Sequence, residues 1–142
     1  MASGKHILFV DTSGWIEVFG TTLPYHKKAR DILADAVAQR RPIITTNYVI
    51  TEFIGLGCKK CKLSREGLFK AVDEITKLRG IQIVYISEET HKEGIKHLHR
   101  FLDKTWSLVD VTSFLVMHER GIIEALAKDE HFTQAGFKEL IF

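Results

Sequence analysis

Short apolar runs alternate with amphipathic segments along the chain, and this alternation constrains the fold more than any other feature of the sequence. Uninterrupted apolar runs are typical of strands that are buried in a parallel sheet. The segments between them have the apolar spacing of helices. We therefore predict an α/β fold in which helices cover both faces of a parallel sheet. The predicted strands are residues 6–10, 43–45, 81–86 and 122–127, and a short fifth strand could follow at 139–142.

Glycines and capping residues mark the ends of the predicted helices. The helix that begins at Asn47 is expected to end at Leu56, because Gly55 and Gly57 close it. Gly80 ends the helix before the third predicted strand, and Gly121 ends the helix before the fourth. One helix begins at residue 14, and the others span 25–40, 47–56, 64–78, 88–104 and 107–120.

The length of 142 residues fits one ordinary domain, and we expect a single domain over residues 1–142. Apolar residues make up 45% of the chain and charged residues 27%, which excludes a disordered chain and a small disulfide scaffold. The longest uncharged run, residues 42–51, is too short to span a bilayer. Residues 1–5 precede too short an apolar stretch for a secretory signal, so we expect a cytoplasmic protein without a membrane segment.

The two cysteines, Cys58 and Cys61, form a single Cys-Lys-Lys-Cys motif. A structural zinc site needs four ligands, and the sequence offers neither a second cysteine pair nor a suitably spaced histidine pair. We interpret the cysteines as reduced thiols near the end of a helix. A thioredoxin-like redox role is the alternative, and the lack of a framing Trp or Pro disfavours it.

Two aspartates are expected at the same edge of the sheet. Asp11 ends the first predicted strand, and Asp129 closely follows the fourth. In a doubly wound sheet these strands can be neighbours where the strand order reverses, and ligands bind beyond the carboxyl ends of the strands at that point. Asp11 could instead only cap the next helix, and an acid in a loop such as Asp129 carries little information by itself.

Two further carboxylates occur on predicted helices. Glu52 falls within an apolar stripe that includes Val49 and Phe53, where an inward-facing carboxylate is costly unless a cation compensates it. Asp110 stands three residues after Ser107, which is the spacing of a capping box, so a purely structural role is a strong alternative for Asp110. A capped helix start also holds its acid rigidly, so both roles can coexist.

Together the four acids have the chemistry of a site for a hard divalent cation. Carboxylate and hydroxyl oxygens suit Mg²⁺ or Mn²⁺, and the hydroxyls of Thr12, Ser13 and Ser107 lie nearby in the sequence. Acids gathered at one rim, with no Lys or Arg among them, repel one another unless a cation is present. A metal can also lower the pKa of a bound water, which then becomes a nucleophile for phosphodiesters.

Basic residues form two groups that favour a polyanionic ligand. The net charge of +2 is small, so the placement of the charges matters more than their excess. A solvated helix face is the ordinary explanation of either group alone. Two such groups beside an acidic site better suit a polyanion whose phosphates they hold. The first group is Lys92, Lys96, Arg100 and Lys104, opposite an apolar face of Ile95, Leu98 and Leu102, and the second is Lys59, Lys60, Lys62 and Arg65.

The chain resembles PIN-domain ribonucleases, specifically the VapC-type toxins of toxin–antitoxin pairs. The resemblance rests on ordered stretches that span nearly the whole chain, and the ordered set is more specific than any one of them. The stretches are FVDTSGW at 9–15, TE at 51–52, DKTWSLVD at 103–110, TSF at 112–114, and ALAKDEHF at 125–132 running on to AGF at 135–137.

This resemblance implies a three-layer α/β/α PIN-like fold with a parallel sheet of order 3-2-1-4-5. It implies a site of Asp11, Glu52, Asp110 and Asp129, in which Asp11 and Asp110 match the metal-binding positions and the other two complete the acidic pocket. The implied cofactor is Mg²⁺, for which Mn²⁺ can substitute, and the implied activity is that of an endoribonuclease. A homodimer and inhibition by a cognate antitoxin are implied as well.

Two positions depart from the family pattern without removing a carboxylate. Val109 stands where the family often has Thr, and Lys128 stands where a neutral residue is more usual. Lys128 could alter the affinity for the metal or reach a phosphate of the substrate.

Other functions stay open at this point. An aspartyl-phosphate phosphatase would use Asp11 as its nucleophile and a second Asp two residues later, but that position is Ser13. A non-cleaving module that binds RNA or an antitoxin would be better served without four acids. The sequence favours a metal-dependent endoribonuclease, and transfer RNA, a ribosomal RNA loop and messenger RNA are all compatible substrates.

Overall fold

A computed structural model describes residues 4–142 of the chain. Its strands form one sheet in the order β3-β2-β1-β4-β5, as expected, and the paired strands are parallel. The strand order reverses between β1 and β4, which lie at the centre of the sheet. The strands are β1 (Leu8–Val10), β2 (Ile43–Thr46), β3 (Ile81–Val84), β4 (Glu124–Leu126) and β5 (Lys138–Glu139).

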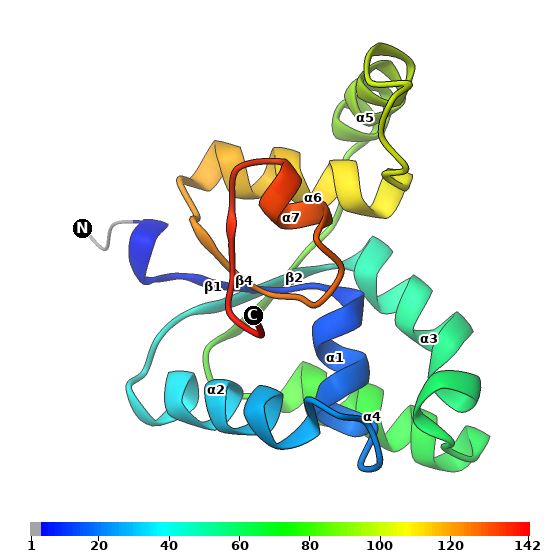
Figure 1. Cartoon of the computed structure of the whole chain (residues 1–142). Coiled ribbons are helices and arrows are strands. Elements are labelled where there is room, and N and C mark those ends of the chain that lie inside the picture. The colour runs from blue at the N-terminus through cyan, green and yellow to red at the C-terminus, as the bar shows by residue number, and fades with distance from the viewer. Residues whose placement is uncertain (1–3) are drawn as a thin grey trace.

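Helices cover both faces of the sheet and give the fold three layers. They are α1 (Thr12–Phe19), α2 (His26–Ala38), α3 (Asn47–Cys61), α4 (Arg65–Lys77), α5 (Glu88–Arg100), α6 (Leu108–Arg120) and α7 (His131–Gln134). Figure 1 shows α6 and α7 on one face of the sheet and α1, α2 and α4 on the other. Helix α3 packs against α1 and α4, and α5 packs against α6. The core lies between these layers, and Phe9, Trp15, Phe53 and Phe132 are among its largest buried side chains.

The start of the chain differs from the prediction. Residues 4–6 form a 3-10 turn, and the first strand begins at Leu8 instead of His6. Leu8 is the first residue that pairs with strands on both sides, with Ile43 of β2 and Glu124 of β4. Part of the segment that was considered for a secretory signal, residues 1–3, lies outside the described residues. Within residues 4–142 no helix is both long and apolar enough to cross a membrane.

Helix α3 is longer than predicted. It runs on to Cys61 through Gly55 and Gly57 instead of ending at Leu56. Glycine inside a helix costs roughly 1 kcal/mol relative to alanine, but Gly57 is buried where α4 crosses α3. A Cβ at this position would lie 2.4 Å from Cδ1 of Leu68. Gly57 therefore lets the Leu68 side chain of α4 pack closely against α3, and it does not end the helix.

Helix α5 is shorter than predicted, and its predicted apolar face is only partly buried. The helix ends at Arg100, and the buried residue within it is Gly94, on the side that faces α6. Leu98 packs against the core, whereas 38% of Ile95 and 83% of Leu102 are exposed to solvent. Leu102 lies beyond the end of the helix, so it cannot extend the predicted face. Helix α7 was not predicted, because four residues are too few for a periodic pattern.

Candidate active site

Asp11 and Asp129 lie at the carboxyl ends of adjacent strands, as predicted. Strands β1 and β4 pair with Val10 opposite Leu126, so the residues that follow them leave the sheet at the same edge. Gly14 allows α1 to start directly against the end of β4, since a Cβ at this position would lie 2.1 Å from the carbonyl oxygen of Leu126. A larger residue would push α1, with Asp11, away from the loop that carries Asp129.

A cavity of about 300 Å³ opens at this edge of the sheet. Asp11 and Asp129 line it from the ends of β1 and β4, Glu52 lines it from α3, and Asp110 lines it from the first turn of α6. The four side chains singled out in the sequence thus come to one cavity from four different elements. The other polar side chains that line it are those of Thr12, Ser13, Lys60, Thr105, Ser107 and His131.

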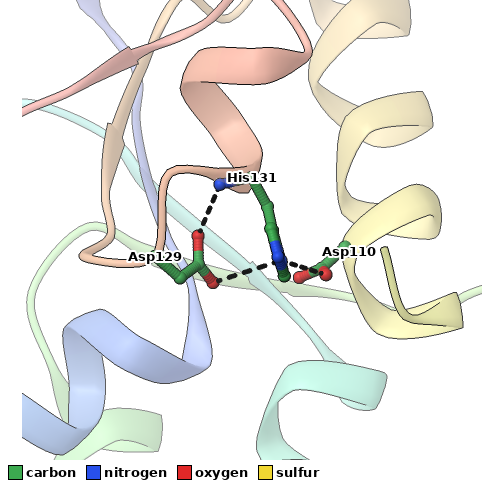
Figure 2. A group of neighbouring side chains, drawn as sticks. All are labelled: Asp110, Asp129 and His131. Atoms are coloured by element: carbon green, nitrogen blue, oxygen red, sulfur yellow. Dashed lines mark hydrogen bonds and ion pairs between the residues drawn. The ribbon is translucent and has the colours of Figure 1, made fainter. Parts of the chain in front are cut away.

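Asp110 caps its helix and also faces the cavity. The Ser107 hydroxyl accepts a hydrogen bond from the Asp110 N–H, and Asp110 Oδ2 accepts one from the Ser107 N–H, each at 3.0 Å. The same carboxylate oxygen lies 2.8 Å from Nδ1 of His131 (Figure 2). The capping box therefore holds Asp110 in a fixed place without removing it from the cavity.

Asp11 caps α1 with only one of its two carboxylate oxygens. Oδ2 accepts hydrogen bonds from the Ser13 hydroxyl at 3.1 Å and from the Ser13 N–H at 3.4 Å. Oδ1 is buried and has no hydrogen-bond partner in the part of the chain that the structure describes. An unpaired buried carboxylate oxygen is costly, so a cap alone does not account for Asp11. The free oxygen fits a ligand that the chain itself does not supply.

The carboxylates of the cavity repel one another when they are ionised. Burial raises the pKa of Asp11 well above its usual range, and the charges of Asp129 and Asp110 raise it further. Burial, with the charge of Asp110, raises the pKa of Asp129 to about 6, while His131 acts in the opposite direction. Both shifts come from negative charges that are held close together in a partly dry site, which a cation would relieve.

Two buried glutamates fix the loop that carries Asp129. Lys128 Nζ lies 3.1 Å from Oε1 of Glu17, a buried residue of α1, and the Lys128 N–H donates to the Ser13 hydroxyl at 3.0 Å. The Asp129 N–H donates to Oε1 of Glu139, a buried residue of β5, at 3.2 Å. Lys128 does not line the cavity of the four acids. Its side chain turns to α1 instead of reaching toward a metal or a phosphate there.

The basic residues only partly match the expectation. Lys60, from the second basic group, lines the acidic cavity, so one positively charged side chain is present among the acids. In the first group, Lys92 and Lys96 are exposed on α5 and lie 3.2 Å and 4.0 Å from carboxylate oxygens of Glu88 and Glu93. These ion pairs neutralise part of the charge of the first basic group, and they are weak because they are exposed to solvent.

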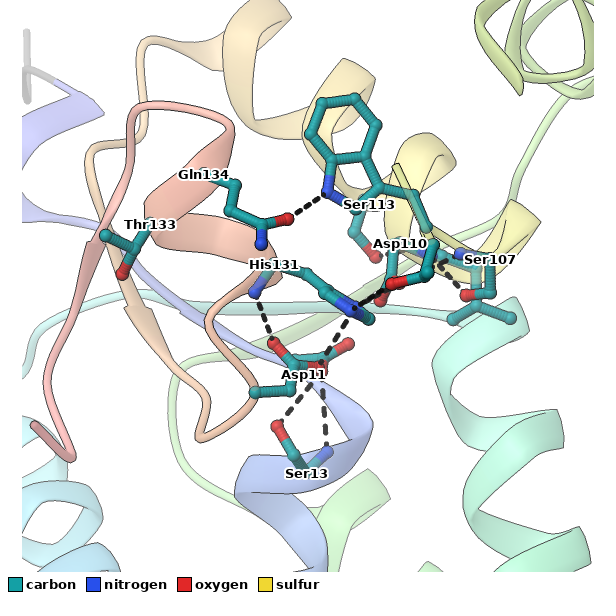
Figure 3. Close-up of polar contacts among 12 residues, drawn as sticks. Asp11, Ser13, Ser107, Asp110, Ser113, His131, Thr133 and Gln134 are labelled. Atoms are coloured by element: carbon teal, nitrogen blue, oxygen red, sulfur yellow. Dashed lines mark hydrogen bonds and ion pairs between the residues drawn. The ribbon is translucent and has the colours of Figure 1, made fainter. Parts of the chain in front are cut away.

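His131 is the main site residue that the sequence reasoning missed. The ring nitrogen Nδ1 of His131 lies 2.8 Å from Asp110 Oδ2 and 3.9 Å from Asp129 Oδ2. The backbone N–H of His131 donates to Asp129 Oδ1 at 3.1 Å. Figure 3 shows the His131 ring beside Asp110, which also contacts Ser107, and shows Asp11 in contact with Ser13. The sequence signal was the Asp129-x-His131 spacing at the start of α7, a helix too short to be predicted.

The two cysteines lie apart from this chemistry. Cys61 is buried, and its thiol donates to the carbonyl oxygen of Ile16 at 3.4 Å. Burial, with the charge of Glu17, raises the pKa of this thiol to about 11. A thiol of high pKa is a poor nucleophile and a poor metal ligand. Neither Cys58 nor Cys61 forms a disulfide, which fits their interpretation as reduced thiols.

Comparison with known proteins gives consistent matches. The PIN domain family model matches residues 8–138. The 23S rRNA-specific endonuclease VapC20 of Mycobacterium tuberculosis, from the strains CDC 1551 and H37Rv, is 28% identical over 135 residues, which cover 94% of this chain and 98% of the relative. The crystal structure of M. tuberculosis VapC20, described as a sarcin-ricin loop cleaving toxin, matches with a TM-score of 0.82 and 27% identity, over 93% of this chain and 97% of that one.

Proposed function

Because this chain belongs to the PIN-domain family, we propose that it is a metal-dependent endoribonuclease and the toxin of a toxin–antitoxin pair. The observation that most directly supports this is the cavity that Asp11, Glu52, Asp110 and Asp129 line at the carboxyl edge of the sheet. Hard oxygen donors at this place suit phosphodiester hydrolysis with Mg²⁺ or Mn²⁺. A relative of nearly equal length is named as an RNA endonuclease.

In this proposal Asp11 and Asp110 hold the cation, and Glu52 and Asp129 complete the acidic pocket. The unpartnered Oδ1 of Asp11 supports its role as a ligand. A cation held there would supply Lewis acidity and would lower the pKa of a water molecule, which is the chemistry that phosphodiester hydrolysis needs. The chain itself holds the donors in place, because the capping box fixes Asp110 and the hydrogen bond to Glu139 fixes Asp129. Lys60, which also lines the cavity, would contact a phosphate of the RNA.

The proposed substrate is a ribosomal RNA loop, because VapC20 is named for 23S rRNA and its structure is described as that of a sarcin-ricin loop cleaving toxin. Mapping of newly formed RNA ends in total RNA after brief expression tests this choice. New RNA ends confined to one ribosomal loop would support a ribosomal substrate. New ends in transfer RNA or messenger RNA would identify that RNA as the substrate instead.

The proposal also includes three properties that accompany such toxins. A cognate antitoxin would inhibit the enzyme, the chain would form a homodimer, and the protein would act in the cytoplasm as one PIN domain over residues 1–142. Light scattering during size-exclusion chromatography measures the oligomeric state directly. A monomeric mass at micromolar concentration would remove the homodimer from the proposal.

Cleavage is expected to require Mg²⁺ or Mn²⁺, and EDTA is expected to abolish it. The reason is that the carboxylates of the cavity repel one another without a cation, and residues 4–142 offer no competing cluster of cysteine ligands. The measurement is the rate of RNA cleavage before chelation, after chelation and after re-addition of each metal. Full cleavage in EDTA would contradict the metal requirement. RNA binding without cleavage in either metal would instead favour a non-cleaving module.

Replacing Lys92, Lys96 and Arg100 with Gln is expected to weaken RNA binding and to flatten its salt dependence. Each lost phosphate contact lowers the slope by about 0.7 log units on single-stranded RNA. The fold is expected to survive, since all three side chains are exposed. The matched control replaces Lys70, Lys77 and Arg79, which are exposed at the other end of the molecule in and after α4. If the salt dependence of RNA binding has the same slope in the two triple variants, Lys92, Lys96 and Arg100 do not contact RNA.

A further inference from the structure

The imidazole of His131 is an additional donor beside the acids, and it differs from them in chemistry. Its Nδ1, a carboxylate oxygen of Asp110 and one of Asp129 all lie within 4.8 Å of one another (Figure 2). Neighbouring ligands of one octahedral cation, with bonds near 2.1 Å, are separated by about 3 Å. The 2.8 Å between His131 Nδ1 and Asp110 Oδ2 is close to this separation. The spacing that forms a hydrogen bond without a metal is therefore also suited to shared coordination.

An independent observation points to a cation in the same cavity. Asp11 is only 2% exposed, and its Oδ1 has no hydrogen-bond partner among the described residues. Asp11 and His131 both line the cavity. The donors that converge there are thus hard carboxylate oxygens together with one borderline nitrogen.

The other ring nitrogen of His131 faces a group that can orient the ring. Nε2 lies 3.4 Å from the Thr105 hydroxyl, which accepts a hydrogen bond from it in the tautomer that carries the proton on Nε2 and leaves Nδ1 with a free lone pair. Ligating histidines commonly donate their second N–H to such a partner, which directs the lone pair of the first nitrogen at the metal. The ring is also held through the backbone, since the His131 N–H donates to Asp129 Oδ1.

We propose that His131 Nδ1 is a metal ligand and that it makes the site select Mn²⁺ over Mg²⁺. This inference rests on the proposed metal-dependent function and adds a ligand to it. Mg²⁺ is bound through oxygen ligands and water. Mn²⁺ shares the preference for carboxylates, but it also begins the affinity series of first-row divalent transition metals, whose later members favour imidazole nitrogen. A site made of carboxylates alone would lack this source of selectivity.

The test uses the intact protein with Mn²⁺ or Mg²⁺ alone and needs no RNA. Pulsed electron paramagnetic resonance of the Mn²⁺-loaded parent is expected to show a directly coordinated histidine nitrogen, assigned by ¹⁵N-histidine labelling. His131→Asn keeps an amide donor near the Nδ1 position for Asp110 but removes the imidazole. This variant is expected to lose the nitrogen coupling and to bind Mn²⁺ about tenfold or more weakly, with Mg²⁺ affinity changed much less. His99→Asn, at an exposed position of α5, is the control and should match the parent.

Each result has a distinct meaning. Absence of a nitrogen coupling in the parent, or an unchanged ratio of Mn²⁺ to Mg²⁺ affinity in His131→Asn, would overturn the inference and leave His131 as a hydrogen-bond partner of Asp110. If such a parent still bound metal and cleaved RNA, the proposed function would stand. A parent that bound neither cation would overturn both.

Discussion

Replacing Asp11 with Asn is expected to reduce RNA cleavage by about a thousandfold or more, the upper range for losing one charge-stabilising group of an active site. Asn keeps the size of the side chain and an oxygen that can accept the Ser13 hydrogen bonds, so α1 keeps its cap. What the substitution removes is the negative charge and one carboxylate oxygen, the buried Oδ1 that has no hydrogen-bond partner among the described residues. The measurement is the initial rate of cleavage at saturating metal, compared with the parent.

The same variant is expected to be at least as stable as the parent when no metal is present. The folded-state pKa of Asp11 is raised, so the folded protein holds this proton more tightly than the unfolded chain does. Stability is therefore lost as the pH rises from the unfolded value through the folded pKa. Asn does not titrate, so the melting temperature of the variant is expected to rise relative to that of the parent as the pH increases above the ordinary pKa of an aspartate.

Added Mg²⁺ or Mn²⁺ is expected to reverse this order, because only the parent keeps its full ligand set and is stabilised by mass action. Asp73→Asn, at an exposed position of α4, is the control and should follow the parent with and without metal. If Asp11→Asn unfolds the metal-free protein, or cleaves as fast as the parent, Asp11 is a structural carboxylate and not a metal ligand.

The positions of the four carboxylates could be predicted because each one has a local signal. Asp11 and Asp129 follow apolar strand runs, Glu52 interrupts an apolar stripe, and Asp110 has the spacing of a capping box. Pairing of β1 with β4 then brings the first two to one edge, where α3 and α6 also begin. The full strand order has no such local signal, and it was implied only by the resemblance to PIN-domain ribonucleases.

The groups that surround these acids could not be predicted, because they depend on contacts between distant segments. The end of α3 was placed too early because Gly57 reads as a helix end unless the packing of Leu68 is known. His131 was missed because its contacts come from folding α7 back over the start of α6. Glu17 gave one usable signal: its neighbours Ile16 and Val18 are both apolar, as expected for a helix that is buried on more than one side, and the structure shows both of them buried.

Replacing Lys128 with Ala is expected to destabilise the protein by about 3 kcal/mol, the lower end of the range for breaking a buried ion pair. Only 2% of the Glu17 side chain is exposed, and the ion pair that the described residues give it is the one with Lys128. We use the lower end of this range because 37% of the Lys128 side chain is exposed, so water can partly take the place of its ammonium group beside Glu17. Urea unfolding measures the change in free energy. Lys138→Ala is the matched control, because its pair with Glu124 is longer and more exposed, and it is expected to cost less than about 1 kcal/mol.

The origin of this cost can be separated from simple loss of packing. The double variant Glu17→Gln with Lys128→Met removes both charges and keeps two long side chains, so it is expected to recover most of the stability lost in Lys128→Ala. Lys128→Ala is also expected to weaken Mn²⁺ binding by about tenfold, since the loop that carries Asp129 loses its side-chain contact with α1 and keeps only the backbone contact with Ser13. If Lys128→Ala costs no more than Lys138→Ala, water compensates Glu17. The position of Asp129 then depends on the backbone contacts with Ser13 and Glu139 and not on the ion pair.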